Sequence, residues 1–369
     1  MPQKIMTVCG PIPPEQLGFT SMHEHIFSDC SMFRSRVRKT CFPLSHRVIK
    51  PEDKVTLENR SELRHDIVLS LDNMKLDDKE MMVNEVAGFK ASGGHSIVEV
   101  SAPGIRSSSD DLIAIRQISE ESGVHVVAST GLYAEDTWPL LYRTMNFTQY
   151  ISFLHREIVQ GIGDTGILPG HIKAAYEVYT PQLKTYLHAA AFASRETGLS
   201  LQVHLGADVT ADEVRKNVIQ PLLQGRCIPE RTILCHVQFL MGVLSIEKLL
   251  NNPGIVPFDI AFHRELLARG FILCFTPFGF EADNELLGIA HYPDWYTLSG
   301  MAVLIREGYA DQLVIGNDVF TKLATRRYGG EGYRRLADFV VPALKRCGVS
   351  DKDINKITVE NPARILAFY

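Results

Sequence analysis

The chain has 369 residues, of which 45% are hydrophobic and 22% are charged, as in an ordinary globular protein. Its 38 lysines and arginines against 43 aspartates and glutamates give a formal net charge of −5, which argues against a nucleic-acid partner. The seven cysteines include no Cys-x-x-Cys pair, so a disulfide framework or a cysteine zinc site is disfavoured and a reducing compartment is favoured. The start does not resemble a signal peptide and no run of about 18 apolar residues occurs, so we expect a cytoplasmic protein without a membrane partner.

Short apolar runs alternate with helical patterns along the chain, which is typical of a parallel α/β architecture. Several runs, such as SIVEV and HVVAS, are almost entirely apolar, as expected for strands that are covered on both faces. The eight runs predicted as strands are Gly18–Phe27, Ser96–Ala102, His125–Tyr133, His171–Glu177, Ser200–Gly206, Thr232–Gln238, Phe271–Gly279 and Leu313–Phe320.

Helix signals separate these runs. Thr180 followed by Pro181 is typical of a helix start, and Gly198 indicates its end. Apolar residues at spacings of three and four over 336–347 predict an amphipathic helix that ends at Gly348.

Eight strands, each followed by a helix, predict an α/β fold, a single (β/α)₈ TIM barrel over residues 1–369 with an N-terminal extension. A doubly wound open sheet is the alternative, but no Gly-rich phosphate loop follows the first strand. Two connections are long, loop one from Cys30 to about Asp78 and loop seven from Phe280 to Ser299. Both are expected at the C-terminal face of the barrel, where loops build active sites.

The first predicted strand ends in His23, Glu24 and His25. Side chains two apart on a strand point to the same side, so both histidines can face into the barrel and chelate one metal while Glu24 points away. On its own, such a pair is more often structural than metal-binding.

Other strand ends carry matching residues: Lys173 on the fourth strand, His204 and His236 on the fifth and sixth, and Asp318 on the eighth. A lone histidine in an apolar run is more often a core residue with one hydrogen bond. Here four histidines and one aspartate gather at one barrel mouth, where buried ionisable groups are costly unless they are paired or bind a metal. Lys173 suits this cluster if carbon dioxide carbamylates its amine and turns it into a bridging carboxylate.

These residues lie in segments through which the chain resembles the phosphotriesterase family of the amidohydrolase superfamily, which includes lactonases and phosphotriesterase-related proteins. The similar segments are TVCGPIPPEQLGFTSMHEHIF, GVHVVASTGLY and RYGGEGY…ITVENPARIL, and the resemblance covers nearly the whole chain.

The resemblance implies a site for two divalent metal ions. The implied ligands are His23, His25 and Asp318 for the buried metal, His204 and His236 for the exposed metal, and carbamylated Lys173 for the bridge. Some relatives carry a glutamate one position after the lysine, but Ala174 stands there, so the carbamylated form is expected. Zinc is the first expectation for the metal, with manganese, cobalt and iron as alternatives.

Such a centre would lower the pKa of a bridging water, and the resulting hydroxide would attack the substrate while Asp318 accepts a proton. Tyr133 resembles a tyrosine that lines the pocket of lactonases and could help to polarise the carbonyl group; a packing role is an equal alternative.

Substrate contacts are expected from loop eight, by similarity to relatives that hold a phosphate there, although a solvated basic loop is the alternative. The residues concerned are Lys322, Arg326, Arg327 and Tyr328. A charge run in loop one could also meet an anion, but it is interpreted as a solvated face. It comprises Arg34, Arg36, Arg38 and Lys39. Loop seven could wall an apolar pocket, or simply pack, through Phe278, Phe280, Trp295 and Tyr296.

Together these features predict a metal-dependent hydrolase that acts on a small molecule, and a lactonase is the first expectation. Candidate substrates include phosphorylated or other anionic lactones, with phosphotriester hydrolysis as a side activity. An amidase acting on small N-acyl compounds is the alternative. A barrel that has lost catalysis and only binds a ligand is the alternative of another class. Relatives are commonly dimers, so a homodimer is an expectation.

Overall fold

The computed structural model describes residues 2–36, 49–242, 258–280, 282 and 293–369. Eight strands form one parallel sheet, in which each strand pairs with the next one along the chain. In sheet order the strands are β3 (Thr20–Glu24), β6 (Ser96–Glu99), β7 (His125–Gly131), β8 (His171–Tyr176), β9 (Ser200–Leu205), β10 (Thr232–Cys235), β11 (Ile272–Phe275) and β12 (Leu313–Ile315).

The sheet curls into a barrel, and β12 returns to the side of β3. The backbone N–H of Asp318 donates a hydrogen bond of 3.0 Å to the carbonyl oxygen of His23 across this seam. All eight predicted strands are confirmed, but most are shorter than predicted. At the sixth and eighth strands part of the reason is local. His236, directly after β10, and Asp318, three residues after β12, have left-handed φ angles of 64° and 57°, so neither strand can run on to its predicted end.

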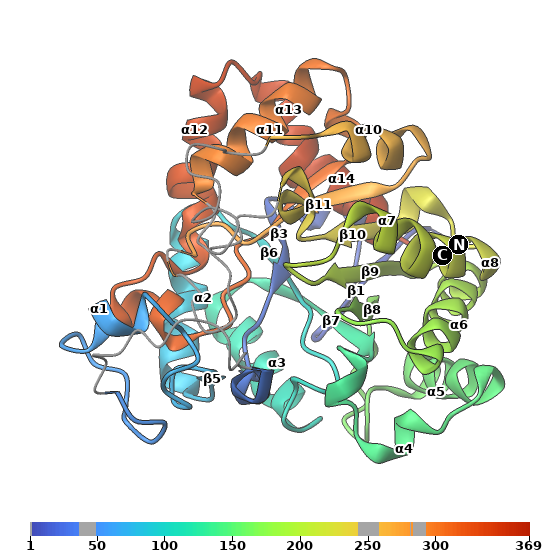
Figure 1. The fold of residues 1–369 in the computed structure, drawn as a ribbon, viewed down its shortest axis with the longest axis horizontal. Helices are drawn as coiled ribbons and strands as arrows, with labels where there is room; N and C mark the ends of the chain where they lie inside the picture. The colour runs from blue at the N-terminus through green and yellow to red at the C-terminus, as the bar shows by residue number, and fades with distance from the viewer. Residues whose placement is uncertain (1, 37–48, 243–257, 281, 283–292) are drawn as a thin grey trace.

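Helices surround the barrel (Figure 1). The helices are α1 (Arg60–Leu63), α2 (Lys79–Ala91), α3 (Asp111–Ser122), α4 (Leu140–Arg143), α5 (Phe147–Gln160), α6 (Pro181–Thr197), α7 (Ala211–Val214), α8 (Gln220–Gln224), α10 (Ala261–Ala268), α11 (Asp294–Arg306), α12 (Val341–Arg346), α13 (Asp351–Asn355) and α14 (Asn361–Leu366). None of the described helices is both long and apolar enough to cross a bilayer.

The two predicted helices are confirmed. The Thr180 side chain caps α6 by accepting a hydrogen bond of 3.0 Å from the Leu183 N–H, and Gly198 follows the helix with a φ of 76°. A π-helical turn over Leu336–Val340 leads into α12, which completes the second helix. Helix α11 begins at Asp294, so the last part of the segment predicted as loop seven is helical.

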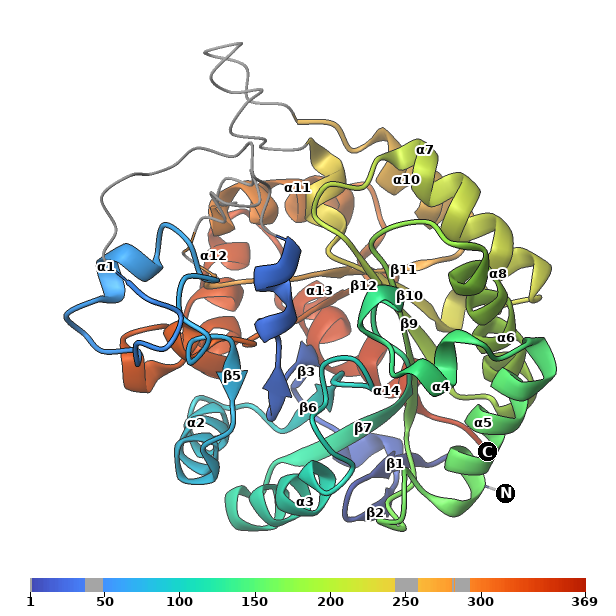
Figure 2. The ribbon, with the colours of Figure 1, turned by 60° about the horizontal axis from the view of Figure 1, so that its bottom comes forward.

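The N-terminal extension forms a hairpin of β1 (Ile5–Thr7) and β2 (Gly10–Ile12). The chain ends lie side by side (Figure 2), where Lys4 and Phe368 exchange two backbone hydrogen bonds of 2.9 Å. Within loop one, the short strands β4 (Ser28–Asp29) and β5 (Lys75–Leu76) pair antiparallel. The extension and the termini therefore pack away from the C-terminal ends of the barrel strands.

A buried tyrosine connects the end of β7 to β8. The Tyr186 hydroxyl on α6 donates to the Lys173 carbonyl (2.6 Å) and accepts from the Leu132 N–H (2.9 Å). The same N–H also lies 3.1 Å from the Lys173 carbonyl oxygen, so the backbone pair has a second connection. This contact fixes the backbone that carries the Lys173 side chain.

The Tyr186→Phe variant should lose about 1 kcal/mol of unfolding free energy, because the two backbone groups keep each other as partners once the hydroxyl is gone. Urea unfolding should show a lower midpoint with an unchanged slope. Tyr179→Phe, at a side chain that is 45% exposed, is the control and should match the wild type. A loss above about 3 kcal/mol would contradict the interpretation that the backbone bond survives.

Candidate metal centre and substrate cavity

The structure brings all six expected ligands to one end of the barrel. The ligand atoms of His23, His25 and Asp318 lie within 4.8 Å of one another, and so do those of His23, His204 and His236. Lys173 is completely buried within electrostatic range of Asp318. The strand ends thus place these side chains at one height of the barrel, as the sequence predicted.

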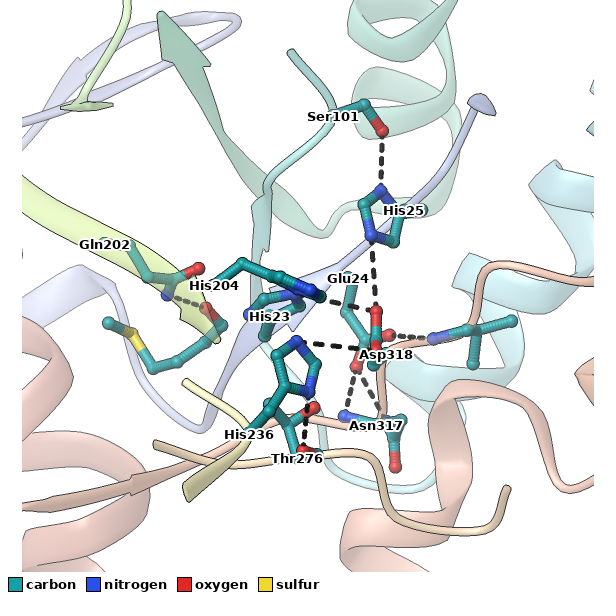
Figure 3. A network of polar contacts seen from close by, with 12 residues as sticks. His23, Glu24, His25, Ser101, Gln202, His204, His236, Thr276, Asn317 and Asp318 are labelled. Atoms are coloured by element: carbon teal, nitrogen blue, oxygen red, sulfur yellow. Dashed lines mark hydrogen bonds and ion pairs between the residues drawn. The ribbon is translucent and has the colours of Figure 1, made fainter. Parts of the chain in front are cut away.

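Asp318 stands at the middle of the cluster (Figure 3). Its Oδ1 lies 3.3 Å from His25 Nε2 and 3.6 Å from His23 Nε2, and its Oδ2 lies 3.9 Å from His236 Nε2. Burial raises the pKa of Asp318, but the contact with His25 and the surrounding imidazoles outweigh it and bring the pKa to about 2. The carboxylate is therefore ionised at neutral pH.

Two histidines are oriented by their outer ring nitrogens. His236 Nδ1 donates a hydrogen bond of 2.8 Å to the Thr276 carbonyl oxygen, so its Nε2 carries the lone pair and faces Asp318. His25 Nδ1 lies 2.8 Å from Ser101 Oγ, which turns its Nε2 toward Asp318. Burial lowers the pKa of His236 to about 3, so its imidazole is neutral and able to ligate.

The residues present fit a divalent metal. Lys173 Nζ and His236 Nε2 are buried and have no hydrogen-bond partner among the described residues. Buried polar atoms left without partners are costly, and such atoms in a cluster indicate a missing ligand. Neutral imidazoles with a carboxylate form a donor set that suits zinc and similar ions.

Glu24 points away from the cluster, as expected, and supports it from behind. Its Oε1 accepts hydrogen bonds from the Asn317 backbone N–H (2.8 Å) and side-chain amide (2.9 Å), and its Oε2 accepts from the Val319 N–H (3.0 Å). Ser21 Oγ donates to the same carboxyl group. These bonds hold Asn317 and Val319, the two neighbours of Asp318, and so keep the left-handed backbone of Asp318 in place.

A cavity of about 350 Å³ opens above the cluster, with His204, His236 and Asp318 among its lining residues. Its other lining residues are Phe33, Arg36, Ile67, Val68, Tyr133, Asp136, Glu177, Val178, Leu205, Ala207, Asp208, Phe239, Pro277, Phe280 and Phe320. Apolar side chains dominate this wall, and loop one supplies four of the residues. Tyr133 lies where the sequence placed it, with its hydroxyl 3.3 Å from His204 Nε2.

The structure does not bring the expected anion-binding residues of loop eight to this cavity. The Lys322 ammonium is already paired with Asp72 (2.9 Å) and Asp77 (3.2 Å). Arg326 and Arg327 are exposed, with Arg327 3.5 Å from Asp78. None of them, nor Tyr328, is among the described residues that line the cavity, so their substrate role has no geometric support.

The interpretation of the loop-one charge run as a solvated face is wrong for two of its members. Arg36 lines the cavity with a side chain that is 22% exposed. Arg34 donates hydrogen bonds of 2.7 and 2.8 Å to the carbonyl oxygens of Val68 and Leu69. Arg38 and Lys39 lie outside the described residues.

The aromatic residues of loop seven divide between cavity, core and surface. Phe280 lines the cavity and stacks on Phe320 with ring centroids 5.3 Å apart. Phe278 is buried in the core. Trp295 is 52% exposed on α11, and Tyr296 on the same helix packs against that core.

Glu177 is a site residue that the sequence analysis missed. Its Oε1 lies 3.0 Å from His204 Nε2, 3.3 Å from the Tyr133 hydroxyl and 3.5 Å from Arg36 Nη1. Burial raises its pKa, but the hydrogen bond from His204 and the charges of His204 and Arg36 bring the pKa to about 2. The strand period was the available signal, because Glu177 stands four residues after Lys173 and faces the same way.

The Glu24→Gln variant should be destabilised by about 3 kcal/mol, since an amide NH₂ would face a backbone N–H and leave it unsatisfied. It should also bind less metal, because the turn that carries Asp318 is loosened. Thermal unfolding and elemental analysis measure the two effects, with Glu80→Gln on the exposed start of α2 as control. Unchanged stability and metal content would show that Glu24 does not hold the turn.

Comparison with known proteins agrees with the fold. Residues 3–366 match the phosphotriesterase family. An N-acetyltaurine hydrolase of Xenopus tropicalis is 29% identical, with 99% of this chain and 98% of that protein covered.

Two solved structures are also similar. A resiniferatoxin-binding protein from Rhodobacter sphaeroides has a TM-score of 0.85 at 29% identity, covering 98% of this chain and 94% of that one. A lactonase from Listeria monocytogenes has a TM-score of 0.72 at 24% identity, covering 99% of both chains, and shows the shared barrel. The match over nearly the entire length establishes that the chain is a member of the phosphotriesterase family.

Proposed function

We propose that this protein is a two-metal hydrolase that opens the carboxylic ester of a neutral, largely apolar lactone. The observation that carries the proposal is the buried Lys173 amine, which has no hydrogen-bond partner among the described residues and lies in a cluster of imidazoles and one carboxylate. An apolar cavity lies directly above that cluster. The pairing of a metal-binding floor with an apolar wall suits an acyl substrate.

Lys173 is suited to carbamylation. Burial lowers its pKa, which favours the neutral amine that attacks carbon dioxide. The reaction forms one N–C bond, releases one proton and leaves a carbamate with two oxygen atoms. His23, His25 and Asp318 would hold one ion, His204 and His236 the other, and the carbamate would bridge them. The bound ions would make hydroxide available near neutral pH and polarise the substrate carbonyl group.

The chain's own side chains complete the reaction. Asp318, ionised and at the cavity floor, would accept the proton of the attacking water and pass it to the leaving oxygen. The Tyr133 hydroxyl, at the cavity wall, would donate a hydrogen bond to the substrate's carbonyl side. The phenylalanines of the wall would exclude water from the reacting group.

The charge balance of the cavity favours a neutral substrate. Arg36 is the one lysine or arginine among the described lining residues, and Asp136 and Glu177 already flank it. A phosphate or sulfonate would have to displace one of these carboxylates, and Asp208 adds a further negative charge to the wall. Phosphorylated lactones are therefore poorer candidates than the sequence suggested.

Amide hydrolysis is the second candidate. The full-length relatives named N-acetyltaurine hydrolase favour it, since the same hydroxide and proton acceptor would serve an N-acyl bond. The apolar wall then favours an N-acyl compound with an uncharged amine part.

A panel of neutral alkyl lactones, phosphorylated lactones, N-acyl amines and N-acetyltaurine should separate these candidates. We expect kcat/KM to be highest for the neutral lactones and to disappear after chelation, with recovery on adding zinc or manganese. A carbamate signal in ¹³C NMR should appear with labelled carbon dioxide and be absent in Lys173→Met. Two bound metals with no turnover of any class would instead support a ligand-binding barrel.

Asp318→Asn should keep most of the metal, because the amide oxygen can still ligate, while kcat falls by roughly 10²–10⁴-fold through loss of the base. The loss should be largest for substrates with poor leaving groups. An activated phosphotriester, whose leaving group departs without a proton, should lose less. Lactone turnover near the wild-type rate with both metals bound would rule out Asp318 as the proton acceptor.

A further inference from the structure

We propose that Glu177 is a positioning residue for the exposed metal, and that Arg36 couples it to loop one. Glu177 holds His204 by its Nε2 and so leaves Nδ1 to bind the ion. The inference rests on the proposed two-metal centre, because it assigns a role toward one of the two ions. It adds a residue outside the six expected ligands.

The hydrogen-bond geometry defines which nitrogen of His204 is free. Glu177 Oε1 lies 3.0 Å from His204 Nε2 and 3.5 Å from Arg36 Nη1, and a carboxylate oxygen between these two groups accepts hydrogen bonds. His204 Nε2 therefore carries the hydrogen, and in the neutral ring Nδ1 carries the lone pair. Metal-binding histidines in general donate their second N–H to a carboxylate, a carbonyl or water, which fixes the tautomer and raises ligand basicity.

Two other histidines of the cluster, His25 and His236, follow the same plan with neutral partners. His236 is held by the Thr276 carbonyl oxygen at 2.8 Å, and His25 contacts Ser101 Oγ at 2.8 Å. His204 differs because its partner is a full negative charge. Its side chain is also 15% exposed, so it lacks the enclosure that keeps His236 in place at 2%. The Glu177 carboxylate, rather than burial, therefore holds the His204 ring in place.

Glu177 is itself fixed by the loop-one segment. Arg36, at the end of the 3₁₀ helix Ser31–Arg36, places Nη1 3.5 Å from Glu177 Oε1. The opposite side of the guanidinium makes a bidentate pair with Asp136 at 2.6 and 2.9 Å. Its face lies 4.8 Å from the Phe33 ring centroid. Two contacts therefore connect loop one to an expected metal ligand: Arg36 to Glu177, and Glu177 to His204.

Direct ligation by Glu177 is the competing interpretation. Among the described residues, the groups whose ligand atoms all lie within 4.8 Å of one another include His204 with His23 and His236, but not Glu177. The carboxylate contacts Nε2 of the His204 ring instead. The geometry thus favours a role through His204.

Metal binding without substrate tests the inference. Apo-protein is titrated with zinc against a chelator of known affinity, for the wild type, Glu177→Gln, Glu177→Ala and Arg36→Met. We expect one of the two zinc affinities to fall roughly 10- to 100-fold in Glu177→Ala. The loss should be smaller in Glu177→Gln, whose amide oxygen can still accept from His204, and smaller again in Arg36→Met. The other affinity should stay unchanged.

Glu135→Gln is the matched control, since it removes a half-buried glutamate outside the cavity lining and should leave both affinities as in the wild type. A crystal structure of zinc-loaded wild type, with anomalous data, should place one ion at His204 Nδ1 with Glu177 still at Nε2. Unchanged zinc affinities in folded Glu177→Ala and Arg36→Met overturn the inference, as does an ion bound to Nε2 or to Glu177 itself. A wild type that binds no zinc overturns the proposed function as well.

Discussion

The site depends on one backbone contact, the hydrogen bond from the Asp318 N–H to the His23 carbonyl oxygen that bridges the seam of the barrel. The two residues are almost 300 positions apart, and each carries a side chain expected to bind the buried ion. The same contact that closes the sheet therefore sets the distance between two ligands. Glu24, located between His23 and His25, reaches across this seam and binds both neighbours of Asp318. The contacts that close the barrel between β12 and β3 therefore also set the positions of the side chains at the site.

The parts that the sequence predicted well are those fixed by chain direction and strand period. The carboxyl ends of parallel strands all lie at one face of a barrel, so His204, His236 and Asp318 had to meet once their strands were identified. Alternation along the predicted strand Gly18–Phe27 likewise put His23 and His25 on the same side. The ends of the sixth and eighth strands could not be predicted in this way, because left-handed backbone at His236 and Asp318 keeps the strands from running on to Gln238 and Phe320. Both residues tolerate that conformation better than a β-branched residue would.

The parts that the sequence predicted poorly are those fixed by long-range pairing of loops. Lys322 looked like an available cation, yet its partners Asp72 and Asp77 lie some 250 positions earlier in a different loop. Arg36 looked solvated, yet Asp136 and Glu177 come from two other connections. A charge count along a loop contains no information about such partners. Glu177 is a different case, since it was the last residue of the predicted strand His171–Glu177 and its parity with Lys173 was visible.

The two halves of the centre are thus supported in different ways. Around the buried ion, the Ser101 hydroxyl orients His25 and the enclosed Glu24 carboxylate holds both neighbours of Asp318. Of the ligands expected for the exposed ion, His236 is likewise held by the barrel, through the Thr276 carbonyl oxygen. Around the exposed ion, the support of His204 comes from Glu177 and, behind it, from a loop-one arginine. A barrel wall is rigid because its core is close-packed, whereas a loop can shift without unfolding the sheet. Changes in loop one should therefore reach the chemistry through the exposed ion first, and the buried ion should keep its ligands as long as the seam between β12 and β3 remains closed.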